Sequence, residues 1–416
     1  MAVEPRTERE ELDVLRARLD ALEREQVERT ARAHHALAAA QVKSYWLDRW
    51  QVDLNSLMRS RLARELRVAI RGAQAGLGAA GQRRALRARL IGAPAKPADA
   101  SVSADDAVTR ALSPDLLRSA PVSELLHERL TPDDLAAVDA RLEPAERELR
   151  DSADAADRTR VTLALAAHHG VKGALDRTGL SAAMPGPEVP AKAHGALAAG
   201  GSYYYADLVA DALRATGFEL QPGQAGLDFG CSSGRIVRVL AAAHPDLEWH
   251  GCDPNPAAVG WASTHLPGIR FQESPESPRL PFGEETFDFA YAISIWSHFA
   301  ERAALDWLDE MRRVLRPRGR LLLTTHGEQS LAHAQRAGRR SPEQLASLRR
   351  ALGERGFWFT PEYEGVGDHG IANPDWGIAF LTAEWLLAKA TPKWRVALFH
   401  PGRVEADQDL YVLERR

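Results

Sequence analysis

The residues whose types and spacing could perform chemistry lie in two short segments, AGLDFGCSSGR at 225–235 and GCDPNP at 251–256. The first is an apolar run that ends at Asp228 and enters a turn containing Gly230. The second is another short apolar run, and it ends at Asp253, about 20 residues beyond that turn. Because the carboxyl ends of neighbouring parallel strands meet at one edge of a sheet, the two segments predict a nucleotide-type ligand site at that edge.

The spacing around the two acids indicates which cofactor would bind. A dinucleotide site carries G-x-G-x-x-G, whereas this chain has D-x-G-x-x-x-G from Asp228 to Gly234. A carboxylate at Asp228 is poorly placed to face a pyrophosphate, but it suits the amino group and sulfonium of S-adenosylmethionine. Asp253 can accept hydrogen bonds from both ribose hydroxyls. We therefore expect S-adenosylmethionine; a nicotinamide cofactor, or a strand-turn-helix unit without a ligand, is the alternative.

Residues from about 200 to 330 resemble a class I S-adenosylmethionine-dependent methyltransferase, with four motifs in the order of that family. The motifs are LDFGCSSGR, GCDPNP, SPESPRLPFGEETFDFAYAISIWSHF and RRVLRPRGRLLLTTHG. The chain departs from the family at Ser232 and Arg318, where glycine is common. The variants ISIWSHF and TTHG are similar to bacterial members associated with glycan and glycosyl-transfer pathways.

The resemblance implies an α/β fold. It consists of a doubly wound, mainly parallel seven-stranded Rossmann-like sheet with a terminal antiparallel hairpin, preceded by an all-helical N-terminal region. Strand and helix patterns alternate after Ser202, as a parallel sheet requires. The tail WRVALFHPGRVEADQDLYVL predicts two strands joined by a turn around Pro401 and Gly402. Before the tail, the pattern predicts a helix over 341–356 and an irregular insertion over 357–374.

The resemblance also implies which residues hold the cofactor. The methionine end is expected at the glycine turn, the ribose at Asp253, and the adenine beside Asn255 and the acid before the LPF turn. Tyr204, in the tyrosine run before the first strand, is expected either to close over the cofactor or to be a packing residue. The expected cofactor-binding residues are Asp228, Gly230, Ser232, Gly234, Asp253, Asn255, Glu276, Ser277, Ser294 and Tyr204.

Three histidines are candidates for a catalytic base, because a hydroxyl acceptor must lose a proton and histidine accepts protons near neutral pH. His298 follows the fourth strand of the resemblance, His326 closes the fifth, and His369 lies in the insertion. Hydrogen bonding that holds the loop is the alternative role for His298. Trp358 and Trp376 are expected to supply stacking faces to an acceptor pocket. No tight run of metal ligands occurs among these residues, so no metal is expected.

The region before this part of the chain is predicted to be helical. Leu12, Leu15, Leu19 and Leu22 have the spacing of a short coiled-coil seam, and an arginine-rich amphipathic stretch follows. The seam predicts a homo-oligomer or packing within the chain. The basic face predicts a solvated surface or weak contact with an anionic membrane surface. The expected divisions are a helical region at 1–92, a second helical region at 108–180, a linker or active-site loop at 181–201, and the methyltransferase domain at 202–416.

Composition narrows the classes of function. The 416-residue chain has a net charge of −4 and only two cysteines, Cys231 and Cys252, which excludes a disulfide framework. It lacks an apolar stretch of about 18 residues and a secretory N-terminus, so a cytoplasmic enzyme is expected. We expect O-methylation of a small molecule or glycan, with no nucleic acid as partner. The alternatives are a protein or nucleic-acid methyltransferase, and a non-catalytic scaffold for glycosyl-transfer partners.

Overall fold

The computed structural model describes residues 120–186, 189, 196–336, 340–361, 373–390, 393–404 and 407–416, with the backbone alone for 196–201 and 336. The predicted coiled-coil seam, the arginine-rich stretch and His369 lie outside these residues. No helix within the described ranges is long and apolar enough to cross a membrane.

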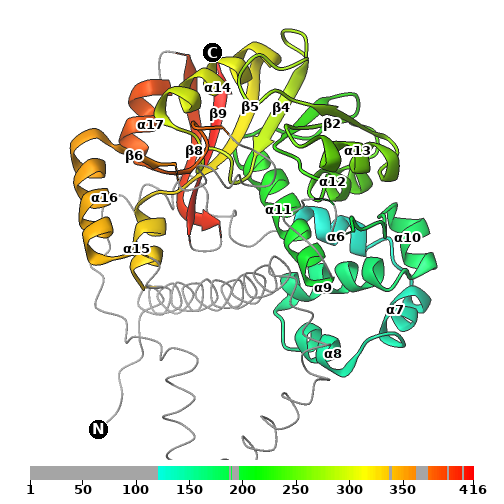
Figure 1. Ribbon diagram of the computed structural model, residues 1–416. Helices are drawn as coiled ribbons and strands as arrows, with labels where there is room; N and C mark the ends of the chain where they lie inside the picture. Colours follow the sequence, from blue (N-terminus) through cyan, green and yellow to red (C-terminus); the bar gives the residue numbers. More distant parts are fainter. Residues whose placement is uncertain are drawn as a thin grey trace, which may run out of the picture. The chain divides into compact units, whose positions relative to one another are not determined.

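One sheet of seven strands forms the centre of the described fold, in the order β3-β2-β1-β4-β5-β9-β8 (Figure 1). β1 to β5 pair in parallel, and β9 pairs antiparallel with both β5 and β8. The expected doubly wound sheet with a terminal antiparallel hairpin is therefore confirmed. The strands are β1 (Ala225–Phe229), β2 (Glu248–Asp253), β3 (Ile269–Glu273), β4 (Phe287–Ala292), β5 (Leu315–Thr325), β8 (Trp394–Val404) and β9 (Gln408–Arg415).

Helices cover both faces of the sheet. Successive residues of a strand point to opposite faces, so neighbouring residues pack against different helices. On β4, Tyr291 packs into the core shared with α11 and α12, whereas Ala290 and Ala292 pack into the core shared with α14 and α17. Strands buried on both faces have continuous apolar runs, which explains the pattern of the sequence here. The helices named here are α11 (Ala196–Ala215), α12 (Val237–Ala243), α14 (Glu301–Val314) and α17 (Ala383–Ala390). A further helix, α13 (Pro256–His265), follows β2.

A group of shorter helices before the sheet packs against α11. α6 and α9 contribute Val122, Leu126 and Leu163 to the same apolar core as α11 and α12. This part of the chain therefore shares its core with the sheet. The described helices of the group are α6 (Pro121–His127), α7 (Pro132–Asp139), α8 (Pro144–Asp151), α9 (Ala155–His168) and α10 (Lys172–Thr178).

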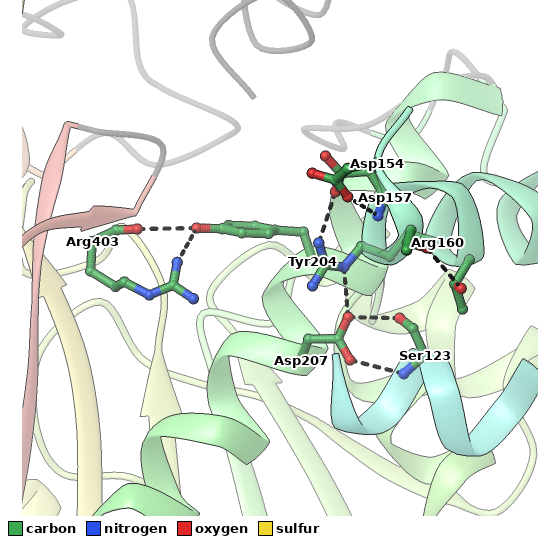
Figure 2. A network of polar contacts seen from close by, with 9 residues as sticks. Ser123, Asp154, Asp157, Arg160, Tyr204, Asp207 and Arg403 are labelled. Carbon is green, nitrogen blue, oxygen red and sulfur yellow. Dashed lines mark hydrogen bonds and ion pairs between the residues drawn. The ribbon is translucent and has the colours of Figure 1, made fainter. Parts of the chain in front are cut away.

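A buried carboxylate, Asp207 on α11, fastens α6 and α9 to the sheet domain (Figure 2). Its Oδ1 accepts the backbone N–H groups of Val122 (2.9 Å) and Ser123 (2.8 Å) in the first turn of α6. Its Oδ2 accepts the Ser123 hydroxyl (2.7 Å) and Nε of Arg160 on α9 (2.7 Å). Asp207 thus satisfies donors at one helix end and pairs with a buried guanidinium, both of which would be costly to leave without partners.

The turn predicted in the C-terminal hairpin is in the wrong place. β8 runs through Pro401 and Gly402, and the chain reverses between Val404 and Gln408. The register of β8 against β9 shifts between His400 and Val404. Proline lacks an N–H donor and is tolerated on edge strands and at bulges, and β8 is the edge strand of the sheet.

The insertion after β5 is more regular than predicted. The expected helix over 341–356 is confirmed as α16 (Pro342–Arg355), which follows α15 (Glu328–Arg336). Residues 357–360, predicted to be irregular, form β6 (Phe357–Thr360), which pairs antiparallel with β7 (Ile378–Leu381). The pattern of a short apolar run does not show which strand it will pair with, and β7 lies well downstream of β6 in the chain.

Candidate functional site

Asp253, the last residue of β2, braces the turn that follows β1. The N–H of Ser232 donates to its Oδ2 (2.8 Å), and the N–H of Asn255 donates to its Oδ1 (2.9 Å). A carboxylate offers about four acceptor positions, so ribose hydroxyls can bond to the same oxygens alongside these amides. The structure thus brings the ends of β1 and β2 together, as the sequence predicted.

The backbone of this turn is left-handed at three positions. Gly230 has φ +83°, Ser232 has φ +50° and Gly234 has φ +72°. A Cβ atom on Gly230 would lie 2.3 Å from Cδ1 of Ile295, so a side chain here would make the Ile295 side chain shift in addition to straining the backbone. Ser232 occupies a conformation that costs a residue with a side chain about 1–2 kcal/mol. The preference for glycine at this position therefore has a conformational cause.

Asp228, at the carboxyl-terminal half of β1, is buried beneath the turn. Burial raises the pKa of its carboxyl group to about 7, although the Tyr291 hydroxyl, Arg235 and the backbone of Val237 oppose the rise. Among the described residues, its Oδ2 has no hydrogen-bond partner of good geometry. A buried oxygen in this state is suited to a ligand that brings a cationic N–H donor.

The residues expected near adenine lie after β2 and after β3. Asn255 is buried, and its Oδ1 caps α13 by accepting the N–H of Ala258 (3.1 Å). Glu276 and Ser277 are exposed on the loop after β3. The carbonyl of Glu276 accepts from Nδ2 of Asn373, which joins this loop to the segment before β7 (3.2 Å).

Tyr204 lies on α11, between the helical group and β8 (Figure 2). Its hydroxyl donates to the carbonyl of Arg403 (3.1 Å) and accepts from Nη1 of Arg403 (2.9 Å). The guanidinium of Arg160 lies over its ring, 5.5 Å from the ring centroid. These contacts connect the helical group with the C-terminal hairpin, which is the packing role that the sequence left open for this residue.

A second polar cluster lies at the ends of β4, β5 and β9. Ser294, with φ +59°, donates its N–H to Oγ1 of Thr324 (2.7 Å), and its hydroxyl is 3.2 Å from that of Ser297. Gln408 of β9 donates to the Ser294 hydroxyl (2.9 Å) and accepts from Oγ1 of Thr324 (2.7 Å). Its Nε2 also lies 3.4 Å from Nε2 of His326. The sequence did not single out Thr324 or Gln408.

Two of the three predicted histidines belong to this cluster. Nδ1 of His298 is 2.7 Å from the carbonyl oxygen of Gly377, and Nδ1 of His326 is 3.1 Å from that of Ala379. A carbonyl oxygen can only accept, so each neutral ring carries its proton on Nδ1 and presents Nε2 as the acceptor nitrogen. The two ring centroids are 6.3 Å apart, and His298 stacks on Trp376 at 4.7 Å.

Comparisons with known proteins relate part of this chain to methyltransferases. Residues 227–319 match the family described as "Methyltransferase domain". The chain is similar to malonyl-[acyl-carrier protein] O-methyltransferase of Methylococcus capsulatus, with 31% identity over 27% of this chain and 41% of that protein. It is also similar to O-methyltransferase cnsE of Penicillium expansum, with 32% identity over 28% of this chain and 45% of that protein. These matches span less than half the length of either relative.

Among solved structures, the chain is similar to an S-adenosylmethionine-dependent methyltransferase of Methanosarcina mazei, with 21% identity, a TM-score of 0.35, and coverage of 47% of this chain and 94% of that one. The matched residues 227–319 begin within β1 and include the glycine turn, Asp253 and the end of β4. The sheet-bearing part of this chain is a class I methyltransferase domain. The cofactor of this methyltransferase domain is S-adenosylmethionine.

The turn of the methyltransferase domain fits that cofactor in three respects. Among the residues that the structure describes, Asp228 Oδ2 is buried and has no hydrogen-bond partner of good geometry, and it suits the ammonium group of the methionine end. Gly230 lacks a side chain where one would collide with Ile295. The carboxylate of Asp253 faces the same turn and suits the ribose hydroxyls.

Proposed function

We propose that this chain transfers a methyl group from S-adenosylmethionine to an oxygen atom of a small molecule or glycan. The observation that carries the proposal is the pair of neighbouring sites at one edge of the sheet. The glycine turn with Asp228 and Asp253 suits the cofactor, and the polar cluster around Ser294 and His298 suits an acceptor hydroxyl. Both similar proteins are named as O-methyltransferases, which supports oxygen as the methylated atom.

In this proposal, His298 acts as the proton acceptor. Its Nδ1–H is held by the carbonyl of Gly377, and its ring is stacked on Trp376, so the direction of Nε2 is defined before the acceptor arrives. When bound, S-adenosylmethionine supplies an electrophilic methyl group, because its sulfonium is a good leaving group. As the acceptor oxygen forms its bond to that methyl group, the hydroxyl proton moves to Nε2 of His298 and afterwards to water.

His326 has a different setting, which favours a positioning role. Its Nε2 lies 3.4 Å from the Gln408 amide nitrogen, and Gln408 also holds Ser294 and Thr324. The side-chain NH2 group of Gln408 thus lies within hydrogen-bonding distance of both the Ser294 hydroxyl and the His326 ring. We assign His326 and Gln408 to orienting the acceptor rather than to taking its proton.

The cofactor site is tested by titration with S-adenosylhomocysteine. Asp253→Asn should weaken binding at least about tenfold, because one carboxylate oxygen is replaced by an NH2 group, which cannot accept from Ser232 N–H or from a ribose hydroxyl. Asp246→Asn is the matched control. Asp246 is exposed and lies just before β2, at the end of the sheet where the parallel strands begin. Equal affinities for the two variants would show that the adenosine site is elsewhere.

The base is tested by transfer of a labelled methyl group to a panel of hydroxylated small molecules and glycans. His298→Ala should lower kcat at least about a hundredfold, with little change in cofactor affinity. His127→Ala, at the end of α6, is the control that should leave both unchanged. Unaltered kcat in His298→Ala would refute the assignment of this base. Transfer to protein or nucleic acid alone, or binding without any transfer, would instead favour one of the alternative functions.

A further inference from the structure

Three side chains with metal-ligating atoms meet away from the cofactor site, between α8 and the end of α9. They are Glu146, His168 and His169, and one ligand atom from each lies within 4.8 Å of the other two. Nε2 of His169 is 2.9 Å from Oε2 of Glu146, and the two imidazole rings are 4.9 Å apart between centroids. Glu146 and the histidines are distant in sequence, so the fold alone brings them together.

We propose that Glu146, His168 and His169 bind one divalent transition-metal ion of the zinc type. Two imidazoles and a carboxylate are ligands that Zn²⁺ accepts in tetrahedral sites, with water as the fourth ligand. With metal–ligand bonds of about 2.0–2.2 Å, the ligand atoms of such a site are roughly 3.4 Å apart. The site therefore requires closure of up to about 1.4 Å, which the exposed side chain of His168 can provide by turning, and a small opening of the 2.9 Å contact between His169 and Glu146.

The surroundings of Glu146 support a ligand role. Its Oε2 accepts the backbone N–H of Glu143 (2.9 Å), so the carboxylate is oriented by the first turn of α8. Such hydrogen bonds to ligating carboxylates hold them in position and tune metal affinity. Hard cations such as Ca²⁺ and Mg²⁺ prefer sets of oxygen ligands, so this set of two nitrogens and a carboxylate discriminates against them.

A metal ion here would explain how α8 is held. α8 buries none of its side chains, although α9 packs firmly against α11. The described contacts that hold α8 are polar, and they include Arg147 Nη2 to the carbonyl of Asp139 (2.9 Å) and the contact of Arg150 with the Asp139 carboxylate. Coordination would replace the single contact between Glu146 and His169 by a three-residue link. The site takes no part in methyl transfer in this proposal.

The test is calorimetric titration of the full chain with Zn²⁺, with Ca²⁺ as the comparison ion. His168→Ala should remove one equivalent of bound zinc or weaken that equivalent at least about tenfold, because loss of a direct ligand costs no less than loss of an outer-shell partner. Zinc should also raise the Tm of the wild-type chain but not that of His168→Ala. His127→Ala is the control, since this histidine lies on α6 and should leave zinc binding unchanged.

Glu146→Gln provides a second variant that keeps the size of the side chain. It should weaken zinc binding while circular dichroism shows the helical content of the wild type. Zinc bound elsewhere on the chain would give the same stoichiometry and affinity for wild type, His168→Ala and Glu146→Gln. That result, or equal affinity for Ca²⁺ and Zn²⁺, would overturn the proposal.

Discussion

Replacing Gly230 by alanine tests the central geometry of the cofactor turn. The residue has φ +83°, where a residue with a Cβ pays about 1–2 kcal/mol in backbone strain. The new Cβ would also lie 2.3 Å from Cδ1 and 2.8 Å from Cγ1 of Ile295. Overpacking of this kind costs about 1–3 kcal/mol, because Ile295 or the turn must move. We expect Gly230→Ala to lower the free energy of unfolding by about 2–5 kcal/mol in total.

Gly268→Ala is the matched control for this variant. Gly268 has φ +86°, but within the described part of the chain no atom beyond its two sequence neighbours lies within 4 Å of the position of its added Cβ. It precedes β3, at the opposite edge of the sheet from the turn. Both substitutions restrict the unfolded chain equally, so the difference between the variants isolates the collision with Ile295. Gly268→Ala should cost only the strain of about 1–2 kcal/mol and should leave cofactor affinity unchanged.

Denaturant unfolding measures the two stabilities, and titration with S-adenosylhomocysteine measures the two affinities. If Ile295 moves toward the ligand, Gly230→Ala should bind at least about tenfold more weakly than the wild type, which corresponds to about 1.4 kcal/mol. Equal stabilities and equal affinities for Gly230→Ala and Gly268→Ala would contradict the predicted collision with Ile295. The turn would then have room for a side chain, and a close approach of ligand to backbone would not explain the glycine.

Two further substitutions test buried charges. Asp207→Asn should destabilise the protein by about 1–3 kcal/mol in thermal or denaturant unfolding, because the buried Arg160 loses one of its two carboxylate partners and keeps Asp157. Asp176→Asn, in the exposed pair with Lys172, should leave Tm unchanged. A similar Tm for both variants would contradict this prediction. Asp409 is buried, and burial raises the pKa of its carboxyl group to about 7. Its folded pKa thus exceeds the unfolded value of about 3.9, so its contribution to stability is present below about pH 4 and is lost as the pH rises through about 7. Asp409→Asn should therefore gain stability relative to the wild type by about 3 kcal/mol between pH 5 and pH 8, and a stability difference independent of pH would show that this carboxyl group titrates normally.

The proximity of the glycine turn and Asp253 could be predicted from the sequence because this geometry is local. The turn from Asp228 to Gly234 follows directly from β1, and Asp253 ends the next strand along the chain. Neighbouring parallel strands joined by one helix place their carboxyl ends together, so order along the chain determines proximity. The conformation of Ser232 follows the same logic, since the turn sets its backbone whatever its side chain.

The polar contacts around Ser294 and His298 could be found only from the tertiary structure. Gln408 reaches Ser294 and His326 because β9 inserts antiparallel between β5 and β8, a register that no local pattern specifies. His298 receives its orienting carbonyl from Gly377, which lies 79 residues further along the chain.

The same holds for the contacts of the helical group. Asp207 meets Arg160 and the start of α6, and Glu146 meets the two histidines, only after the helices have packed on α11. Amphipathic periodicity predicts that a helix has a buried face, but not which neighbour covers it. The sequence alone was therefore enough to predict the class of the domain, its cofactor and the proximity of the glycine turn to Asp253. Packing between distant segments decided which polar side chains gather around Ser294 and His298, because such contacts depend on strand register and helix placement rather than on spacing along the chain.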